Sequence, residues 1–179
     1  MKFKLTILLL GFCYFAKAQK AIRLDEVNHK DTIGAEHAVI YGTFVQRLNA
    51  MTSGGLNQEL YLRDTTTKEL YVFRAKPLFK SAKQNNFIFY IKPGTYAIVE
   101  YMYQKSTWYG FKEFRHQIKK PEGSAYLFTI TPGSLNELGI WHFEKENIYF
   151  ENAAAEVRDK LRQDYQKLDF TKVVQDIPR

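Results

Sequence analysis

The sequence contains a single cysteine, Cys13, and this residue lies within an N-terminal pattern typical of a secretory signal peptide. Two early lysines precede an apolar run from Leu5 to Phe15, and Ala16-Lys17-Ala18 provides a small-x-small cleavage site. We therefore expect residues 1–18 to be a signal peptide and the mature chain to begin at Gln19. Such a mature chain has no disulfide bond, no catalytic cysteine and no cysteine metal ligand.

Long hydrophobic runs are also lacking. The run from Leu5 to Phe15 is shorter than the ~20 residues that a membrane-spanning helix needs, so we expect no transmembrane segment in the mature chain. Phe12 occupies the place where a lipid-modified cysteine needs a small residue, which argues against lipid anchoring through Cys13. The expected location is the periplasm or the outside of the cell.

The motifs of common catalytic and metal sites are missing as well. The four histidines lie in different segments, and none has the His-x-His or His-x-x-x-His spacing of a metal site. The sequence has no Gly-x-Ser-x-Gly nucleophile motif and no glycine-rich phosphate loop before a basic helix start. It therefore predicts no catalytic residues, no metal and no cofactor.

The net charge is too small to indicate a nucleic-acid partner. The full chain carries +7, and loss of three lysines with the signal peptide leaves +4. We interpret a local basic cluster as a solvated loop and expect no nucleic-acid binding. The cluster consists of Lys112, Arg115, His116, Lys119 and Lys120.

Aromatic residues, in contrast, are abundant and make up 16% of the chain. They lie in short β-branched and aromatic segments separated by turn residues, a pattern typical of an all-β domain with about nine strands. The segment from His37 to Val45 is the first strong strand, and its continuous apolarity predicts burial on both faces. Gly42 within it indicates a β-bulge or a close approach of another backbone.

Two Pro-Gly turns, Pro93-Gly94 and Pro132-Gly133, separate the strongest strand patterns. Proline presets φ at the first central position of a turn and glycine permits positive φ at the second. We therefore interpret both turns as chain reversals between core strands. Trp141 lies in the strand pattern after the second turn, and we expect it to anchor the core.

The periodicity changes from strand to helix near the C-terminus. Apolar residues from Val157 to Leu168 recur at helical spacing, which predicts an amphipathic helix over about residues 153–168. Residues 19–36 show no sustained period and are expected to form an extended lead-in, so that residues 37–179 form one domain. The predicted fold is all-β, an antiparallel two-sheet β-sandwich with one C-terminal amphipathic helix packed on it.

The aromatic residues also provide the sharpest binding hypothesis. Strand alternation places Tyr101 and Tyr103 on one face, and Trp108 and Tyr109 follow shortly afterwards. Because such rings combine an apolar body with a polar group, they suit sugar and protein surfaces. The hypothesis is a stacking platform for a ligand built from Tyr101, Tyr103, Trp108 and Tyr109. The alternative, which strand patterns favour, is that these rings fill the core and pair across strands.

Three segments together carry a resemblance: Val39–Phe44, Ile91–Tyr96, and the Ile130–Gly133 turn that leads to Leu138–Trp141. They resemble a family of uncharacterised bacterial secreted and lipid-anchored proteins with a small β-sandwich. That family is similar in style to carboxypeptidase regulatory, or transthyretin-like, domains. The resemblance covers most of the mature chain and implies a β-sandwich in the cell envelope without catalytic residues, although the missing lipobox departs from the anchored members.

A second resemblance leaves another fold open. Gly139-Ile140-Trp141 is similar to the Gly-x-Trp motif of calycin-like antiparallel β-barrels, which also combine about eight strands with one late helix. In that family the motif lies near the first strand, whereas here it lies near the end. A barrel of this kind would enclose a small apolar ligand.

The functional expectation is a non-catalytic, exported protein of the cell envelope with a binding or structural role through the surface of its sandwich. Its expected partner is an envelope protein or a glycan. Two alternatives remain at this stage. One is a barrel-type carrier of a small apolar ligand, and the other is a glycan-binding module that uses exposed Tyr and Trp side chains.

Overall fold

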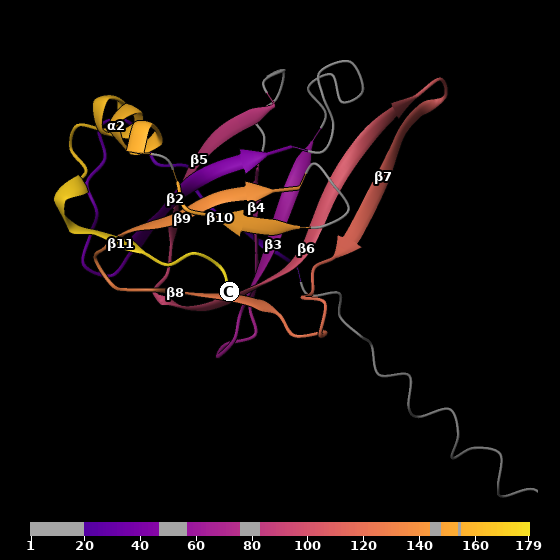
Figure 1. The fold of residues 1–179 in the computed structure, drawn as a ribbon, viewed down its shortest axis with the longest axis horizontal. Coiled ribbons are helices and arrows are strands. Elements are labelled where there is room, and N and C mark those ends of the chain that lie inside the picture. Colours follow the sequence, from indigo (N-terminus) through magenta and orange to yellow (C-terminus); the bar gives the residue numbers. More distant parts are fainter. Residues whose placement is uncertain (1–19, 47–56, 76–82, 144–147, 154) are drawn as a thin grey trace, which may run out of the picture.

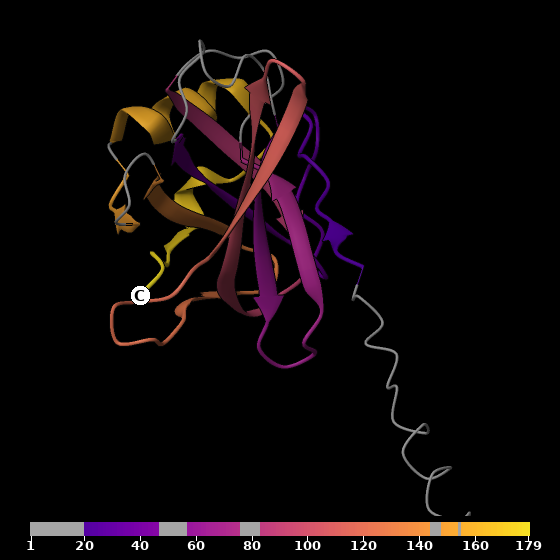
Figure 2. The same cartoon turned by 90° about the vertical axis from the view of Figure 1, so that its right-hand side faces the viewer.

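Two β-sheets face each other in the computed structural model, and one helix lies against the outside of one sheet (Figures 1 and 2). The all-β, two-sheet architecture predicted from the sequence is confirmed. The expected signal peptide at 1–18, with Cys13, lies outside the described residues. The structure describes residues 20–46, 57–75, 83–143, 148–153 and 155–179.

The six-stranded sheet has the order β1-β4-β3-β6-β7, and β8 also pairs with β6. The five-stranded sheet has the order β10-β9-β2-β5, and β11 also pairs with β9. The strands are β1 (Ile22–Arg23), β2 (Ala38–Val45), β3 (Gln58–Asp64), β4 (Leu70–Arg74), β5 (Gln84–Ile91), β6 (Gly94–Thr107), β7 (Gly110–Gln117), β8 (Tyr126–Ile130), β9 (Leu135–His142), β10 (Tyr149–Glu151) and β11 (Val173–Gln175).

The expectation of purely antiparallel sheets is wrong, because both sheets are mixed. β2 pairs with β9 in parallel, and β1 with β4 and β11 with β9 are parallel as well. The two Pro-Gly turns explain the central parallel pair. Pro93-Gly94 carries the chain from β5 in one sheet to β6 in the other, and Pro132-Gly133 carries it back from β8 to β9. Each turn changes sheet instead of forming a hairpin, so β9 meets β2 without being its sequential partner.

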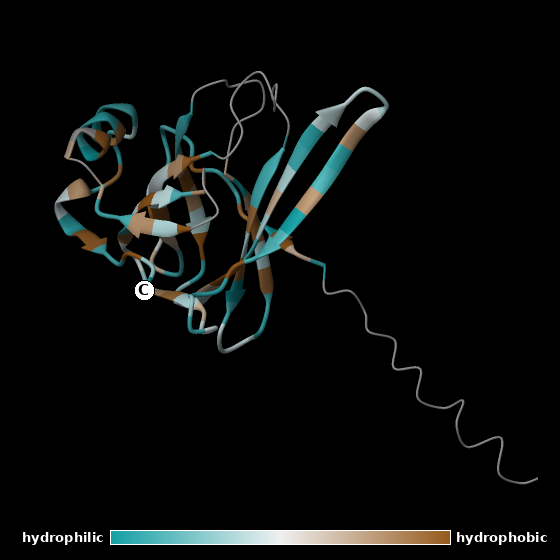
Figure 3. Ribbon diagram, turned by 45° about the vertical axis from the view of Figure 1, so that its right-hand side comes forward, coloured by the Kyte–Doolittle hydropathy of each residue, from teal (hydrophilic) through white to brown (hydrophobic). Residues whose placement is uncertain are grey.

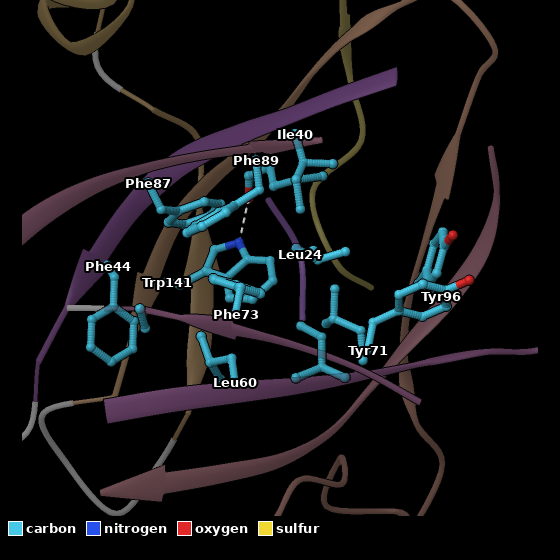
Figure 4. Close-up of a cluster of buried hydrophobic side chains, with 14 of the residues drawn as sticks. Leu24, Ile40, Phe44, Leu60, Tyr71, Phe73, Phe87, Phe89, Tyr96 and Trp141 are labelled. Atoms are coloured by element: carbon cyan, nitrogen blue, oxygen red, sulfur yellow. Dashed lines mark hydrogen bonds between the residues drawn. The ribbon is translucent and has the colours of Figure 1, made fainter. Parts of the chain in front are cut away.

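The described strands form no closed barrel, so the calycin-like alternative does not apply to this part of the chain. Trp141 lies in the middle of the space between the sheets with 0% of its surface exposed (Figure 4). Its indole nitrogen donates a hydrogen bond to the Leu138 carbonyl oxygen at 2.7 Å. Trp141 is therefore the core anchor that the sequence predicts. Its ring lies 5.3 to 6.1 Å, centroid to centroid, from those of Phe73, Phe87, Phe128 and Phe150.

All eight residues of β2 are buried, which confirms the prediction of burial on both faces. The close backbone approach expected at Gly42 is also present. The pairing of β2 with β9 shifts register beside Gly42, and a Cβ atom there would lie 2.7 Å from the Gly139 carbonyl oxygen. Gly139 itself has a φ of 76°, where a side chain would be strained. Glycine at both positions therefore permits the close backbone approach of β2 and β9.

The N-terminal described segment joins one pair of sheet edges. β1 pairs with β4 of the six-stranded sheet, and the chain then turns to β5 of the five-stranded sheet. There the Val27 amide donates to the Ile88 carbonyl at 3.3 Å, and the Tyr90 amide donates to the Asp25 carbonyl at 2.9 Å. The expected lead-in is thus extended, and its residues Leu24 and Val27 are buried.

The C-terminal segment joins the opposite pair of sheet edges. β11 pairs with β9 of the five-stranded sheet, and the last residues reach β8 of the six-stranded sheet. Arg179 and Leu127 exchange two backbone hydrogen bonds of 2.8 and 3.0 Å. Both open sides of the sandwich are therefore bridged, one by residues 22–27 and the other by residues 173–179.

The predicted amphipathic helix is present as α2 (Ala155–Asp164), which ends earlier than the expected residue 168. Leu161 on the helix and Leu168 beyond it are buried in one cluster with Tyr41, on the outer face of the five-stranded sheet. Burial of this stripe attaches the helix to the sheet.

A buried carboxylate also links the helix to the sheet. Glu137 of β9 is 1% exposed and is hydrogen-bonded by the guanidinium of Arg158 on α2. It also accepts hydrogen bonds from the Tyr41 hydroxyl at 3.1 Å and from the Gln175 amide at 2.6 Å. Burial and the charge of Glu137 raise the pKa of Tyr41 above its ordinary value. Both oxygens of the buried Glu137 carboxylate therefore accept hydrogen bonds.

Candidate functional site

The β6–β7 hairpin extends away from the two sheets (Figures 1 and 3). Its last pair is Thr107 with Gly110, and Trp108 and Tyr109 form the two-residue turn between them. Gly110 has a φ of 131°, and the Thr107 hydroxyl donates to its carbonyl oxygen at 2.9 Å. These local constraints hold the tip of the hairpin in a tight turn.

Three aromatic side chains at this tip are exposed to solvent. The exposed fraction is 95% for Trp108, 68% for Tyr109 and 68% for Phe111. The Trp108 and Tyr109 rings lie 5.2 Å apart at an interplanar angle of 90°. The other exposed large hydrophobic residues of the described chain, Ile22, Leu127 and Val174, lie apart in the sequence and are less exposed. The tip is therefore a local apolar knob on a charged surface.

The four-ring platform predicted from the sequence does not form. Tyr101 is 2% exposed and Tyr103 is 8% exposed, whereas Trp108 and Tyr109 lie at the tip of the hairpin. The Tyr101 hydroxyl donates to the buried side-chain oxygen of Gln58 at 2.6 Å. The hypothesis therefore keeps two of its four residues, and the alternative reading, in which the rings fill the core, is correct for Tyr101 and Tyr103.

A β-bulge in β6 explains why strand alternation misplaced the rings. Tyr61 of β3 pairs with Glu100, but the next residue of β3 pairs with Ile98, so Val99 is an extra residue in β6. The bulge shifts the alternation by one residue. As a result Ile98 before the bulge and Tyr101 after it both face the core.

Stacked rings stiffen the base of the hairpin. Tyr103 of β6 stacks on Phe114 of β7, with centroids 5.1 Å apart and an interplanar angle of 10°. Tyr103 also stacks on His116 at 5.5 Å and 6°. Cross-strand aromatic pairs of this kind stabilise an antiparallel ribbon, so the exposed tip is carried on an ordered stem.

Two lysines lie directly opposite each other just below the tip. Lys105 pairs with Lys112 across the hairpin, and both are exposed. The Lys112 ammonium lies 5.2 Å from the centroid of the Phe114 ring. The acid nearest in the sequence, Glu113, is bound to Arg115 at 2.6 Å. Residues 105–112 contain no acidic side chain, so the tip is both aromatic and positively charged.

Phe111 and Lys105 were not among the predicted site residues. The available signal was Gly110, because a glycine directly after two aromatic residues is compatible with a two-residue hairpin loop. With the turn placed there, both residues fall at its two flanks.

An open groove of about 410 Å³ lies near the base of the same hairpin. Its lining includes Tyr61, Glu100, Arg115 and Gln117. The Arg115 guanidinium lies 5.5 Å from the centroid of the Tyr61 ring and donates to Glu100 at 2.6 Å. The second Glu100 oxygen accepts from Gln117 at 2.9 Å. The carboxylate in this groove is therefore engaged on both oxygens.

The basic cluster predicted around residues 112–120 is solvent-facing for most of its members. Arg115 forms ion pairs with Glu100 and Glu113, and Lys120 lies 3.9 Å from Glu122. Hydrogen bonding to Glu113 raises the pKa of Arg115. The cluster is therefore partly neutralised by its neighbours.

The described residues contain no group of three or more His, Cys, Asp or Glu side chains arranged to hold a metal ion. In the same residues, no helix has the length and apolarity to cross a membrane.

Comparisons with known proteins add little to this picture. No protein-family model matches the chain, and no curated protein matches its sequence. Among solved structures, the chain is similar to a leucine-rich repeat protein from Bacteroides thetaiotaomicron, with 10% sequence identity and a TM-score of 0.40. The match covers 73% of this chain and 16% of that protein, so the chain spans about a sixth of its length. The resemblance to transthyretin-like domains stays a prediction.

Proposed function

We propose that this protein is a non-catalytic, exported binding protein of the cell envelope that contacts its partner with the tip of the β6–β7 hairpin. The observation that carries the proposal is the exposure of Trp108, Tyr109 and Phe111 together on a projecting arm. Exposed clusters of large apolar side chains are unfavourable in water and often mark interaction sites. The residues that contribute most to binding at protein interfaces are rich in Trp and Tyr.

The chemistry of the neighbouring groove supports binding over catalysis. A carboxyl group that acts as a general acid or base must be free to exchange a proton with substrate. Both oxygens of Glu100 are instead held by Arg115 and Gln117. Export is supported by the signal-peptide pattern of residues 1–18.

The shape of the tip bears on the choice of partner. A flat sugar face stacks best on a ring, or on several rings that lie parallel, whereas Trp108 and Tyr109 are perpendicular. An apolar knob of this form fits a soft or concave surface better than a glycan chain. A glycan partner is therefore retained as an outcome of the test below.

The test compares two triple variants of the chain that begins at Gln19, which contains every described residue. In the tip variant, Trp108→Ser, Tyr109→Ser and Phe111→Ser remove the exposed aromatics. In the matched control, Ile22→Ser, Leu127→Ser and Val174→Ser remove exposed hydrophobic residues elsewhere. Cosedimentation with isolated cell-envelope fractions measures binding.

We expect the tip variant to bind at least tenfold more weakly than the unmodified chain, because hot-spot aromatics contribute about 2 kcal/mol or more each. The control variant keeps its affinity. Circular dichroism and thermal melting verify that both variants are folded. Equal envelope binding by the tip variant and the unmodified chain would refute the proposed function.

A further inference from the structure

The charge pattern of the hairpin tip conflicts with the needs of folding. Lys105 and Lys112 are direct cross-strand neighbours, and like charges in this arrangement destabilise a hairpin. No described carboxylate forms an ion pair with either of them, since Glu113 is bound to Arg115. The pair therefore suits the binding of something negatively charged.

The lysines lie at a fixed distance behind the aromatic turn, which suits a partner with an apolar layer beneath a negatively charged layer. Lys105 lies three residues before Trp108, and Lys112 lies three residues after Tyr109. At about 3.4 Å per strand residue, the two lysine side chains leave the backbone about 10 Å behind the turn. This matches the ~5–10 Å to which interfacial apolar groups enter the boundary between lipid headgroups and acyl chains.

The types of residue match the two layers of a membrane surface. Trp and Tyr concentrate at membrane interfaces because their rings combine apolar and polar parts. Lysine side chains keep their ammonium groups at the level of the phosphates while their methylenes lie along apolar surface. The absence of any acid from residues 105–112 removes the repulsion that a carboxylate would meet there.

We infer that the tip of the β6–β7 hairpin inserts into the headgroup region of an anionic phospholipid bilayer. Trp108, Tyr109 and Phe111 enter the interface, while Lys105 and Lys112 bind lipid phosphates. This inference rests on the proposed function and identifies its partner as a lipid surface. Figure 3 shows the far end of the hairpin extending beyond the other described strands, so its tip is accessible to a flat surface.

The experiment uses vesicles of phosphatidylcholine alone and vesicles that also contain phosphatidylglycerol, with the chain that begins at Gln19. We expect cosedimentation with the anionic vesicles that weakens as salt is added. Tryptophan emission shifts to shorter wavelength on binding. This shift reports on Trp108, because Trp141 is already excluded from water.

Lysine substitutions separate a local contact from the effect of overall charge. Lys105→Gln together with Lys112→Gln should weaken binding to anionic vesicles about 25-fold, since each lysine near such a surface contributes ~1 kcal/mol. Lys30→Gln together with Lys160→Gln removes the same charge from exposed positions elsewhere and should have a much smaller effect. Equal losses in the two double variants would overturn the inference.

The outcomes distinguish this inference from the proposed function. If envelope fractions bind the chain through the tip but phospholipid vesicles do not, the lipid inference is wrong and the proposed function stands. Protease treatment of the fractions then identifies a protein partner, and glycosidase treatment identifies a glycan. If neither envelope fractions nor vesicles bind through the tip, both proposals are wrong.

Discussion

The two tryptophans of the chain occupy opposite environments. Trp141 is enclosed between the sheets, touches aromatic rings from both sides and has its indole nitrogen hydrogen-bonded. Trp108 lies at the end of the hairpin with 95% of its surface exposed. Both residues follow strand-like sequence. Core packing determines the position of Trp141, whereas the hairpin turn determines that of Trp108. The same side chain therefore serves folding in the body and is available for contact at the tip.

The two regions also treat charge differently. In the body, the buried Glu137 is surrounded by Arg158, Tyr41 and Gln175. At the tip, Lys105 and Lys112 face each other across the hairpin. The body satisfies the buried Glu137 carboxylate with internal hydrogen bonds, as stability requires of a buried charge. At the tip, the aromatic side chains are exposed to solvent, and neither lysine forms an ion pair with a described carboxylate. Both features are expected of a contact surface.

The largest effect should follow from breaking the body. Trp141→Ala removes the side chain at the centre of the core and leaves a cavity, which should lower the free energy of unfolding by ~3–5 kcal/mol. Denaturant unfolding followed by circular dichroism measures this loss. A decrease below about 1 kcal/mol would show that Trp141 is not the anchor of the core.

The body was predicted from the sequence more completely than the tip. The all-β class, the buried strand at β2, the central Trp141 and the C-terminal amphipathic helix all follow from periodicity and composition. These features depend on patterns that extend over many residues, so one irregularity does not erase them. The parallel pairing of β2 with β9 depends on which sheet each turn leads to, and local turn chemistry does not determine that.

The site was predicted only in part, because one extra residue in β6, Val99, changes which side chains face the core. The bulge at Val99 reverses the faces of the residues that follow, so Tyr101 and Tyr103 point into the core. Bulges have no firm sequence signature in a strand of β-branched and aromatic residues. Trp108 and Tyr109 remained candidates because a two-residue turn exposes its side chains whichever face the strands present.

A smaller effect on stability is expected in the body at alkaline pH, through Tyr41. The pKa of Tyr41 is raised in the folded state, first by burial and second by the charge of Glu137. Its stabilising contribution is therefore complete below pH 10.0, the ordinary tyrosine pKa, and is lost as pH rises above it.

Tyr41→Phe should cost about 1 kcal/mol at pH 8, through loss of the hydrogen bond to Glu137. The deficit should shrink above pH 10, because the variant has no hydroxyl to ionise at this position. Urea unfolding of both proteins across the alkaline range measures the difference. A deficit that stays constant with pH would show that the Tyr41 hydroxyl does not couple folding to alkaline pH.

The smallest effect on stability is expected at the tip, where it tests the comparison most directly. Trp108→Ala removes an indole that solvent surrounds, so the free energy of unfolding should change by less than about 0.5 kcal/mol. The same protein should bind envelope fractions more weakly than the unmodified chain does. A stability loss close to that of Trp141→Ala would mean that Trp108 packs into the fold, and the tip would then no longer be a surface reserved for a partner. If Trp108→Ala retains stability and weakens binding, Trp141 serves folding and Trp108 serves contact with a partner.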